Sequence, residues 1–294
     1  MRIAVTGRAG QVATCLGERG RSAGHTIVPV GRPELELAGG SAEAIRAALA
    51  AATPDVIVSA AAYTAVDQAE SEPDRAFAVN AAGAGKVAQA AAELDVPLVH
   101  LSTDYVFAGT SDAPYAEGDP TGPQGVYGAS KLAGEQAVLA AQPNTAILRT
   151  AWVYSPFGAN FVKTMLRLAE TRPELGVVAD QWGNPTSALD LADGVLAVAA
   201  NLVERGDDAL RGVFHMTAGG ETHWAGLAEA IFAASTARGG PSARVIPITT
   251  AQFPTPARRP ANSRLDCARL ARVHDVRLPE WRGSLAVVIE RLLG

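Results

Sequence analysis

The fold of this chain is decided by the stretch Thr6-Gly7-Arg8-Ala9-Gly10-Gln11-Val12-Ala13, which joins an apolar run to a helical segment. Residues 2–5 are typical of a strand, and residues 11–19 carry helical periodicity. Gly7 permits a tight turn between them, and Gly10 lets backbone N–H groups approach a pyrophosphate. Because a helix N-terminus adds positive potential, the stretch predicts a dinucleotide site. The alternative is an ordinary strand-to-helix turn.

The segments after this turn alternate between short apolar runs and alanine-rich helical stretches. The expected strands are residues 26–30, 56–60, 97–101 and 146–149, and the expected helices are 42–51, 73–94 and 125–141. Strands separated by helices predict right-handed βαβ units. The predicted fold class is therefore α/β, with a Rossmann-type, doubly wound parallel sheet that carries helices on both faces.

The second half of the chain follows this alternation less regularly. Helices are expected at residues 160–170, 189–203, 224–234 and 279–293, separated by loops rich in Pro, Gly, Asn and Arg. The loops at 155–160, 180–187 and 250–263 have the composition of binding loops, which often carry specificity. We therefore expect a dinucleotide-binding domain over residues 1–150, to which later segments return, and a smaller, mainly substrate-binding part over residues 151–294.

Composition and charge exclude several classes of function. Apolar residues make up 48% of the 294 residues and charged residues 19%, with a formal net charge of −5. This acidic balance disfavours nucleic acid and anionic membranes as partners. The two cysteines form no C-x-x-C pair, and the histidines lack metal-ligand spacing, so no metal site is predicted. Without a signal peptide or an apolar stretch of membrane-spanning length, a soluble cytoplasmic protein is expected.

The end of the second expected strand favours one nicotinamide cofactor. An NAD site usually places a carboxylate there to hold the ribose 2′-hydroxyl. Here Gly31 and Arg32 follow the strand, and the first carboxylate is Glu34. Arg32, with Arg8, could pair with a 2′-phosphate, which favours NADPH. NADH remains possible, because Arg32 could equally be a solvated loop residue.

Tyr127 and Lys131 stand four residues apart at the start of an expected helix, and therefore share one face. A tyrosine has an unperturbed pKa of about 10, so proton transfer near neutral pH needs a neighbour that shifts it. An ammonium nearby would stabilise the phenolate and lower that pKa. Y-x-x-x-K alone is a weak signal, because helices often contain both residues.

A hydroxyl residue strengthens this signal. Thr103 follows the expected strand 97–101, at the carboxyl end where open α/β sheets bind ligands. Its side chain could hydrogen-bond a reacting oxygen and polarise a carbonyl. The alternative is a threonine that only caps the next turn. Together, the glycine turn, Thr103, Tyr127 and Lys131 predict an oxidoreductase.

With these motifs, nearly the whole chain resembles the extended short-chain dehydrogenase/reductase superfamily and, within it, the dTDP-4-dehydrorhamnose reductase family. The glycine turn and Y-x-x-x-K mark only the superfamily. More specific are A-A-Y-T-A-V-D at residues 61–67, S-T-D-Y-V-F at 102–107 and R-P-A-N-S-R-L at 259–265. Ala13, where a third glycine often stands, is a mild departure from the pattern.

The resemblance implies roles for individual residues. It implies Tyr127 as proton donor, Lys131 as the group that tunes it and Thr103 as the third catalytic residue. It places Thr103, Asp104 and Trp152 at the sugar or nucleotide, and Gly10, Gln11, Val12, Ala62, Tyr63 and Thr64 at the cofactor. The residues themselves already give the cofactor site Gly7, Gly31, Arg32, Tyr127 and Lys131, whose ammonium could bond the nicotinamide ribose. Trp152 could also be a core aromatic residue.

Two basic residues are candidates for the diphosphate of a nucleotide-sugar substrate. An acidic protein must concentrate cations where a dianion binds, and Arg258 and Arg259 stand together in an expected binding loop. A solvated basic loop is the alternative.

A bridging metal is doubtful in this chain. Some family members are described as dimers joined by Mg²⁺ through glutamates, but Cys15 and Leu189 stand near those places here. Hard oxygen ligands are therefore missing at both. Monomer and homodimer both remain open.

The activity that the resemblance implies is NADPH-dependent reduction of the C4 ketone of dTDP-4-dehydro-L-rhamnose to dTDP-L-rhamnose, in dTDP-rhamnose biosynthesis. One alternative is another nucleotide-sugar epimerase or dehydratase, since Asp104 follows Thr103 where dehydratases place an acid, although the neighbouring glutamate is missing. A second is a non-catalytic NADP-binding regulatory subunit, like the β subunit of methionine adenosyltransferase. Net NADPH consumption, or copurification with a partner enzyme, separates these cases.

Overall fold

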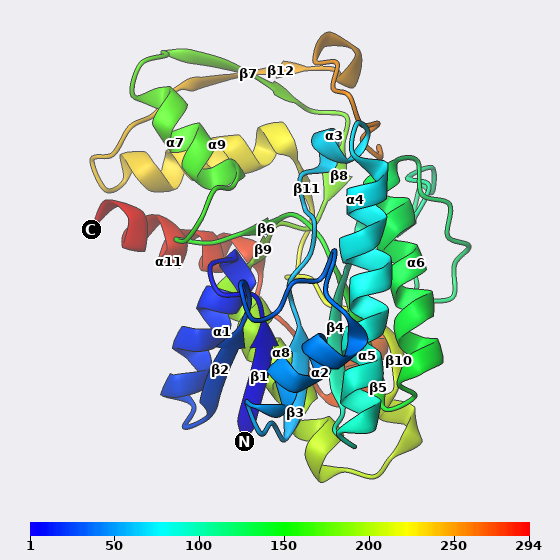
Figure 1. Cartoon of the computed structure of the whole chain (residues 1–294). Helices are drawn as coiled ribbons and strands as arrows, with labels where there is room; N and C mark the ends of the chain where they lie inside the picture. Colours follow the sequence, from blue (N-terminus) through cyan, green and yellow to red (C-terminus); the bar gives the residue numbers. More distant parts are fainter.

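A six-stranded parallel sheet lies at the centre of the computed structural model, which describes all 294 residues (Figure 1). The strand order is β10-β5-β4-β3-β1-β2. The strands are β1 (Arg2–Thr6), β2 (Thr26–Val30), β3 (Val56–Ser59), β4 (Leu98–Thr103), β5 (Thr145–Thr150) and β10 (Gly212–His215). Every pairing in the sheet is parallel. The predicted fold class is confirmed, and β10, which was not predicted, joins the sheet from the second half of the chain.

Both faces of the sheet are covered by helices, because successive residues of each strand point to opposite sides. Ile3 and Val5 pack into one buried cluster, whereas Ala4 between them packs into another. The first cluster includes residues of α1 (Gln11–Ser22) and α8 (Ala188–Glu204), and the second includes residues of α2 (Ala42–Ala50), α5 (Ala84–Glu93) and α6 (Val126–Ala141). Near-continuous apolar strands are what burial on both faces requires.

The helix predicted over residues 73–94 is interrupted by one wider turn. It begins as α4 (Pro73–Phe77), continues as the π-helical turn η1 (Ala78–Gly83) and resumes as α5. Within η1, the carbonyl oxygen of Asn80 approaches Gly134 of α6 so closely that a Cβ at Gly134 would lie 2.0 Å from it. Single π-helical turns inside longer helices are frequent at functional sites.

Several elements from the second half of the chain form a smaller layer beyond the carboxyl ends of the sheet strands (Figure 1). The paired strands β7 (Glu174–Val178) and β12 (Arg244–Ile248) lie over α7 (Phe161–Ala169) and α9 (Trp224–Thr236), and α11 (Trp281–Leu293) packs against α9. These helices were predicted. The small elements between them were not: α3 (Val66–Ala69), α10 (Ala268–His274), β6 (Val153–Tyr154), β8 (Trp182–Gly183), β9 (Thr186–Ser187) and β11 (Thr222–His223).

None of the helices combines the length and the apolar composition that crossing a membrane would need.

Gly134→Ala tests the close packing of α6 on η1. Alanine normally stabilises a helix relative to glycine, but here its Cβ would collide with the Asn80 carbonyl oxygen. We expect the free energy of unfolding to fall by about 1–3 kcal/mol, the usual cost of overpacking. Gly283→Ala in α11 is the matched control, because nothing lies within 4 Å of its Cβ position; it should gain up to ~1 kcal/mol. Both free energies of unfolding are measured by urea unfolding, and an equal gain in stability for the two variants would contradict the packing constraint at Gly134.

Candidate active site

A cavity of about 1090 Å³ opens at the carboxyl ends of the sheet strands, between the sheet and the smaller layer. The strand order reverses between β1 and β3, and ligands bind at such a reversal in open α/β sheets. The cavity brings together most residues that the sequence nominated: Gly7, Gly10, Gln11, Val12, Gly31, Arg32, Ala62, Tyr63, Thr64, Thr103, Asp104, Tyr127, Lys131 and Trp152. Arg258 and Arg259 are not among its lining residues.

The turn between β1 and α1 has the geometry that its glycines allow. Gly7 has φ +97°, and its N–H donates to the carbonyl oxygen of Val30 at 2.7 Å. A Cβ at Gly10 would meet no atom within 4 Å, so the backbone there is open to the cavity. No side chain caps α1, and its first turn holds no acidic residue. The uncapped N–H groups and the helix dipole therefore face the cavity, as anion binding requires.

Two side chains tie this region together: Thr6, which was not among the residues nominated from the sequence, and Gln11, which was nominated for the cofactor. Thr6 Oγ1 accepts hydrogen bonds from the N–H groups of Ala60 and Ala61, at 3.0 and 2.9 Å, and so joins the ends of β1 and β3. The side-chain oxygen of Gln11 accepts from Ser155 Oγ and Asn160 Nδ2. The side chain of Gln11 therefore connects the start of α1 to the 155–160 loop.

The two arginines near β2 differ in their partners. Arg8 forms an ion pair with Glu34 at 2.6 Å. Arg32 is exposed at the cavity, forms no ion pair and lies next to Gly31. Arg32 is therefore the cation that is free to meet an anionic group at this end of the cavity.

Asn80, which no sequence motif singled out, fixes the 62–64 segment to α6. Its Oδ1 accepts the N–H of Tyr63 at 2.8 Å, and its Nδ2 donates to the Tyr63 carbonyl and to Ser130 Oγ, both at 3.0 Å. Ser130 stands between Tyr127 and Lys131 on α6. A single buried amide thus holds the cofactor-side loop and the Y-x-x-x-K helix in register. A lone asparagine in an alanine-rich helix was the only signal.

Tyr127 and Lys131 both face the cavity, but their pKa values shift differently from the expectation. Burial, reinforced by the nearby Asp104 carboxylate and opposed by a hydrogen bond with Thr103, raises the pKa of Tyr127 to about 12. Burial, opposed by Glu135, lowers the pKa of Lys131 to about 8. Lys131 Nζ donates to the carbonyl oxygen of Leu101 at 2.7 Å. The expected lowering of the tyrosine pKa by Lys131 is therefore wrong for this arrangement, because the ammonium is directed at the sheet.

Thr103 and Asp104 lie at the end of β4, only 5% and 3% exposed. Thr103 Oγ1 donates to Asp104 Oδ1 at 2.9 Å and accepts the N–H of Tyr105 at 3.3 Å. Asp104 Oδ2 is buried without a hydrogen-bond partner. Burial raises the pKa of Asp104 to about 6. Thr103 is thus more than a turn cap, because it bonds a buried carboxyl group in the cavity that Tyr127 also lines.

Trp152 forms an aromatic wall of the cavity and is held in a rare backbone conformation. Its φ is +49°, which bulky residues seldom adopt, and its ring stacks on Trp224 with centroids 3.6 Å apart. Trp224 Nε1 donates to Gln181 Oε1 at 3.2 Å, which fixes the second ring. Such strain is typical of sites where the side chain must point at a ligand. The alternative of a purely core tryptophan does not hold, because Trp152 lines the cavity.

The two candidate diphosphate residues lie beside the cavity rather than in its wall. Arg258 is exposed and donates to Gln124 at 3.2 Å. Arg259 pairs with Asp67 of α3 at 2.7 Å, and Asp67 also accepts the N–H of Ala257. One guanidinium nitrogen of Arg259, Nη1, is buried without a partner.

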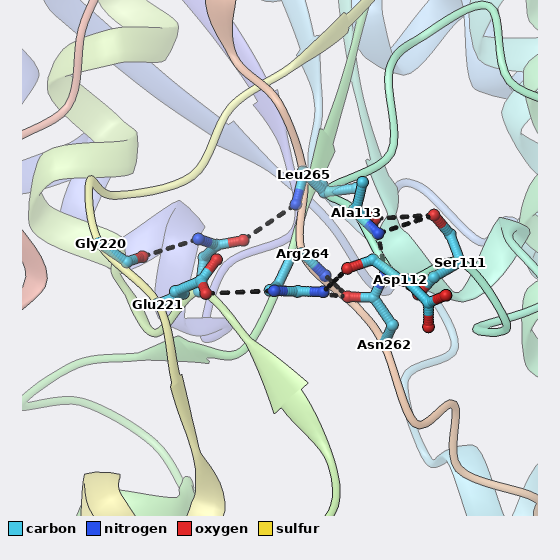
Figure 2. Close-up of polar contacts among 9 residues, drawn as sticks. Ser111, Asp112, Ala113, Gly220, Glu221, Asn262, Arg264 and Leu265 are labelled. Atoms are coloured by element: carbon cyan, nitrogen blue, oxygen red, sulfur yellow. Dashed lines mark hydrogen bonds and ion pairs between the residues drawn. The ribbon is translucent and has the colours of Figure 1, made fainter.

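The segment after Arg259 is a structural connector (Figure 2). Asn262 Nδ2 donates to the carbonyl oxygens of Ser111 and Ala113, both at 2.8 Å, and Arg264 donates to the Asp112 carbonyl and pairs with Glu221. The R-P-A-N-S-R-L motif therefore joins the 109–115 loop to the loop before β11.

The two positions at which the resemblance would put ligands of a bridging Mg²⁺, Cys15 and Leu189, do not fit a hard cation. Cys15 is fully buried between α1 and α8, and Leu189 is 7% exposed. Burial raises the pKa of the Cys15 thiol to about 12, so it is not an anionic ligand. Magnesium prefers oxygen ligands, which neither residue offers.

Comparisons with known proteins agree on one family. A family model described as the RmlD substrate binding domain matches residues 1–293. A dTDP-4-dehydrorhamnose reductase of Sinorhizobium fredii is 51% identical over 293 residues, covering 100% of this chain and 98% of the relative. The solved dTDP-4-dehydrorhamnose reductase of Clostridium acetobutylicum matches with a TM-score of 0.91 at 37% identity, over 99% of both chains. That of Bacillus anthracis, in complex with NADP, matches with a TM-score of 0.90 at 34% identity, over 98% of both.

The raised pKa of Asp104 makes a prediction about stability. The folded state binds this proton more tightly than the unfolded chain does. The resulting contribution of Asp104 to stability is therefore fully present below pH 3.8, its ordinary pKa, and is lost as the pH rises through about 6. Asp104→Asn removes this dependence. Between about pH 5 and about pH 8, the stability of the variant relative to wild type should rise by about 1 kcal/mol. Urea unfolding at both pH values measures it. If the stability difference between Asp104→Asn and wild type were the same at both pH values, the pKa of Asp104 would not be raised.

Proposed function

The chain belongs to the dTDP-4-dehydrorhamnose reductase family, and on this premise we propose that it reduces the C4 ketone of dTDP-4-dehydro-L-rhamnose to dTDP-L-rhamnose, using NADPH. The observation that carries the proposal is the convergence of Tyr127, Thr103 and Lys131 on one cavity beside the glycine turn. When bound, NADPH supplies the hydride that reduces C4. The protein holds the ketone and delivers the proton.

Tyr127 is the proton donor in this proposal. With its pKa raised to about 12, the phenol is protonated at neutral pH and is an acid rather than a base. That state suits reduction, because the ketone oxygen gains electrons as hydride adds and needs a proton. Lys131, held by the Leu101 carbonyl, keeps further N–H groups for the nicotinamide ribose.

The cofactor residues follow from the same geometry. The open N-terminus of α1, with Gly10 to Val12, suits the diphosphate, and Ala62 to Thr64 suit the neighbouring ribose side. Arg32 is proposed to hold the 2′-phosphate, because it lies free at the end of β2. The Bacillus anthracis relative, whose structure contains NADP, supports this choice. NADH is a possible second cofactor.

The substrate residues are proposed to come mainly from the later part of the chain. Trp152 packs on the sugar, Asp104 and Thr103 meet its polar groups, and Arg259, which lies beside the cavity and pairs with Asp67, is the candidate for the diphosphate. Arg258 is a weaker candidate, because it is exposed and directed at Gln124. Residues 1–150 would thus bind mainly the cofactor and residues 151–294 mainly the substrate, although α8 and β10 pack into the sheet layer.

Tyr127→Phe tests the proton donor. We expect turnover with dTDP-4-dehydro-L-rhamnose, followed as NADPH oxidation, to fall by about 10²–10⁴-fold, because general acid catalysis is lost. Binding of NADPH should survive. Tyr154→Phe is the control: Tyr154 is a buried tyrosine outside the cavity whose hydroxyl donates to the Trp281 carbonyl, and it should retain turnover. Wild-type rates in the Tyr127 variant would refute the role. Turnover without net NADPH oxidation would indicate an epimerase or dehydratase.

Arg32→Ala tests the cofactor preference. Loss of a charge-assisted hydrogen bond should weaken NADPH binding by about tenfold or more, and should leave NADH binding unchanged. Titration of nucleotide fluorescence measures both. Arg21→Ala, in the last turn of α1 and away from the cavity, is the matched control and should change neither. Equal weakening of both cofactors would show that Arg32 does not recognise the 2′-phosphate.

A further inference from the structure

The hydroxyl of Thr103 has a single proton, and the structure shows where it is used. Its Oγ1 donates to Asp104 Oδ1 at 2.9 Å, and one of its lone pairs accepts the N–H of Tyr105. An ionised carboxylate only accepts hydrogen bonds. While Asp104 is ionised, Thr103 therefore presents a lone pair, and no proton, to the cavity.

A protonated Asp104 reverses this arrangement. The carboxylic acid then carries an O–H that can donate to Thr103 Oγ1. Thr103, relieved of its acceptor, can turn its own O–H toward the cavity that both residues line. Tyr127 lines the same cavity as Thr103, so both hydroxyl groups could donate to one ligand oxygen there.

We propose that Asp104 is a positioning residue that sets the direction of the Thr103 hydroxyl, so that Thr103 donates to the ketone oxygen beside Tyr127 only while Asp104 is protonated. This inference rests on the proposed function. In the reaction, hydride adds to C4, the carbonyl π electrons move to oxygen, and Tyr127 transfers its proton there. Thr103 polarises the oxygen by hydrogen bonding and, like Asp104, keeps its proton.

The surroundings of Asp104 permit both states near neutral pH. Its Oδ2 has no close hydrogen-bond partner and no cation forms an ion pair with it, while the nearby Ser263 hydroxyl favours the ionised form and so opposes the effect of burial on the pKa of Asp104. The titratable groups that interact with it are Tyr105 on its own turn and Tyr127 from α6, and Arg259 and Asp67 lie near Tyr105; Lys131, also on α6, lines the same cavity but is directed at the Leu101 carbonyl. Burial raises the pKa of Asp104 to about 6, so a modest change of pH shifts its protonation.

The test compares pH profiles of kcat/KM, at saturating NADPH, for wild type and three variants. From about pH 5 to about pH 8, kcat/KM of the wild type should fall at least about tenfold, and the fall should begin near pH 6. The size follows because one hydrogen-bond donor to a developing oxyanion is worth about 10²–10³-fold in rate. Asp104→Asn should lose this limb and vary by less than about threefold over the range, because an amide N–H donates at every pH. The profile of Thr103→Val should also be flat near pH 6, but its kcat/KM should be as low at every pH as that of the wild type at high pH. Thr103→Ser should keep the limb near pH 6.

The variants separate this role from a structural one. A limb near pH 6 that persists in Asp104→Asn, even with lower activity throughout, would overturn the proposal. So would a wild-type profile that is flat across this range. A limb near pH 8, where Lys131 titrates, should remain in all four proteins and does not bear on Asp104. No NADPH oxidation at any pH would overturn the proposed function and this inference together, whereas activity without the limb overturns only the inference.

Discussion

The contact between the π-helical turn η1 and α6 is the constraint on which the site depends. Gly134 allows the Asn80 backbone to touch α6, and the Asn80 side chain then bonds Tyr63 and Ser130. A regular α-helix over residues 73–93 would direct Asn80 differently, because one extra residue in a π turn rotates everything after it. The two sides of the cavity, one proposed for the cofactor and one carrying Tyr127, are therefore positioned by the same buried amide.

A buried ion pair fixes α6 to the sheet strands whose ends line the cavity. Arg149 pairs with Glu135 of α6 at 2.6 Å, with side chains only 5% and 3% exposed, and Ser102 donates to the same carboxylate. Such a pair contributes little net stability, since desolvation offsets the attraction. Breaking it would leave a charge uncompensated, so it fixes α6 against β4 and β5. Lys131, one turn before Glu135, takes its position from this arrangement.

The sequence predicted the features that depend on a repeated pattern, and it did not reveal those that depend on a single long-range contact. Alternating apolar runs and alanine-rich helices determined the parallel sheet, and the glycine turn located the cavity. Strand β10 was missed because its four residues, Gly212–His215, lie in a loosely patterned region. Asn80, Thr6 and Asp67 were missed because each acts through a long-range hydrogen bond. The pKa of Tyr127 was misjudged because spacing shows which groups are near, but not which way an ammonium points.

The polar groups without partners show how the remaining specificity arises. Buried polar atoms are almost always hydrogen-bonded, so exceptions need a reason. Asp104 Oδ2 and Thr150 Oγ1 belong to residues that line the cavity, at the ends of neighbouring strands, and Arg259 Nη1 lies beside Tyr105. By contrast, the backbone around the glycine turn is bonded to Val30 and to Thr6. The backbone of the proposed cofactor side is therefore bonded within the protein, whereas Asp104 and Thr150 bring unpaired oxygens to the strand ends at which the substrate is proposed to bind.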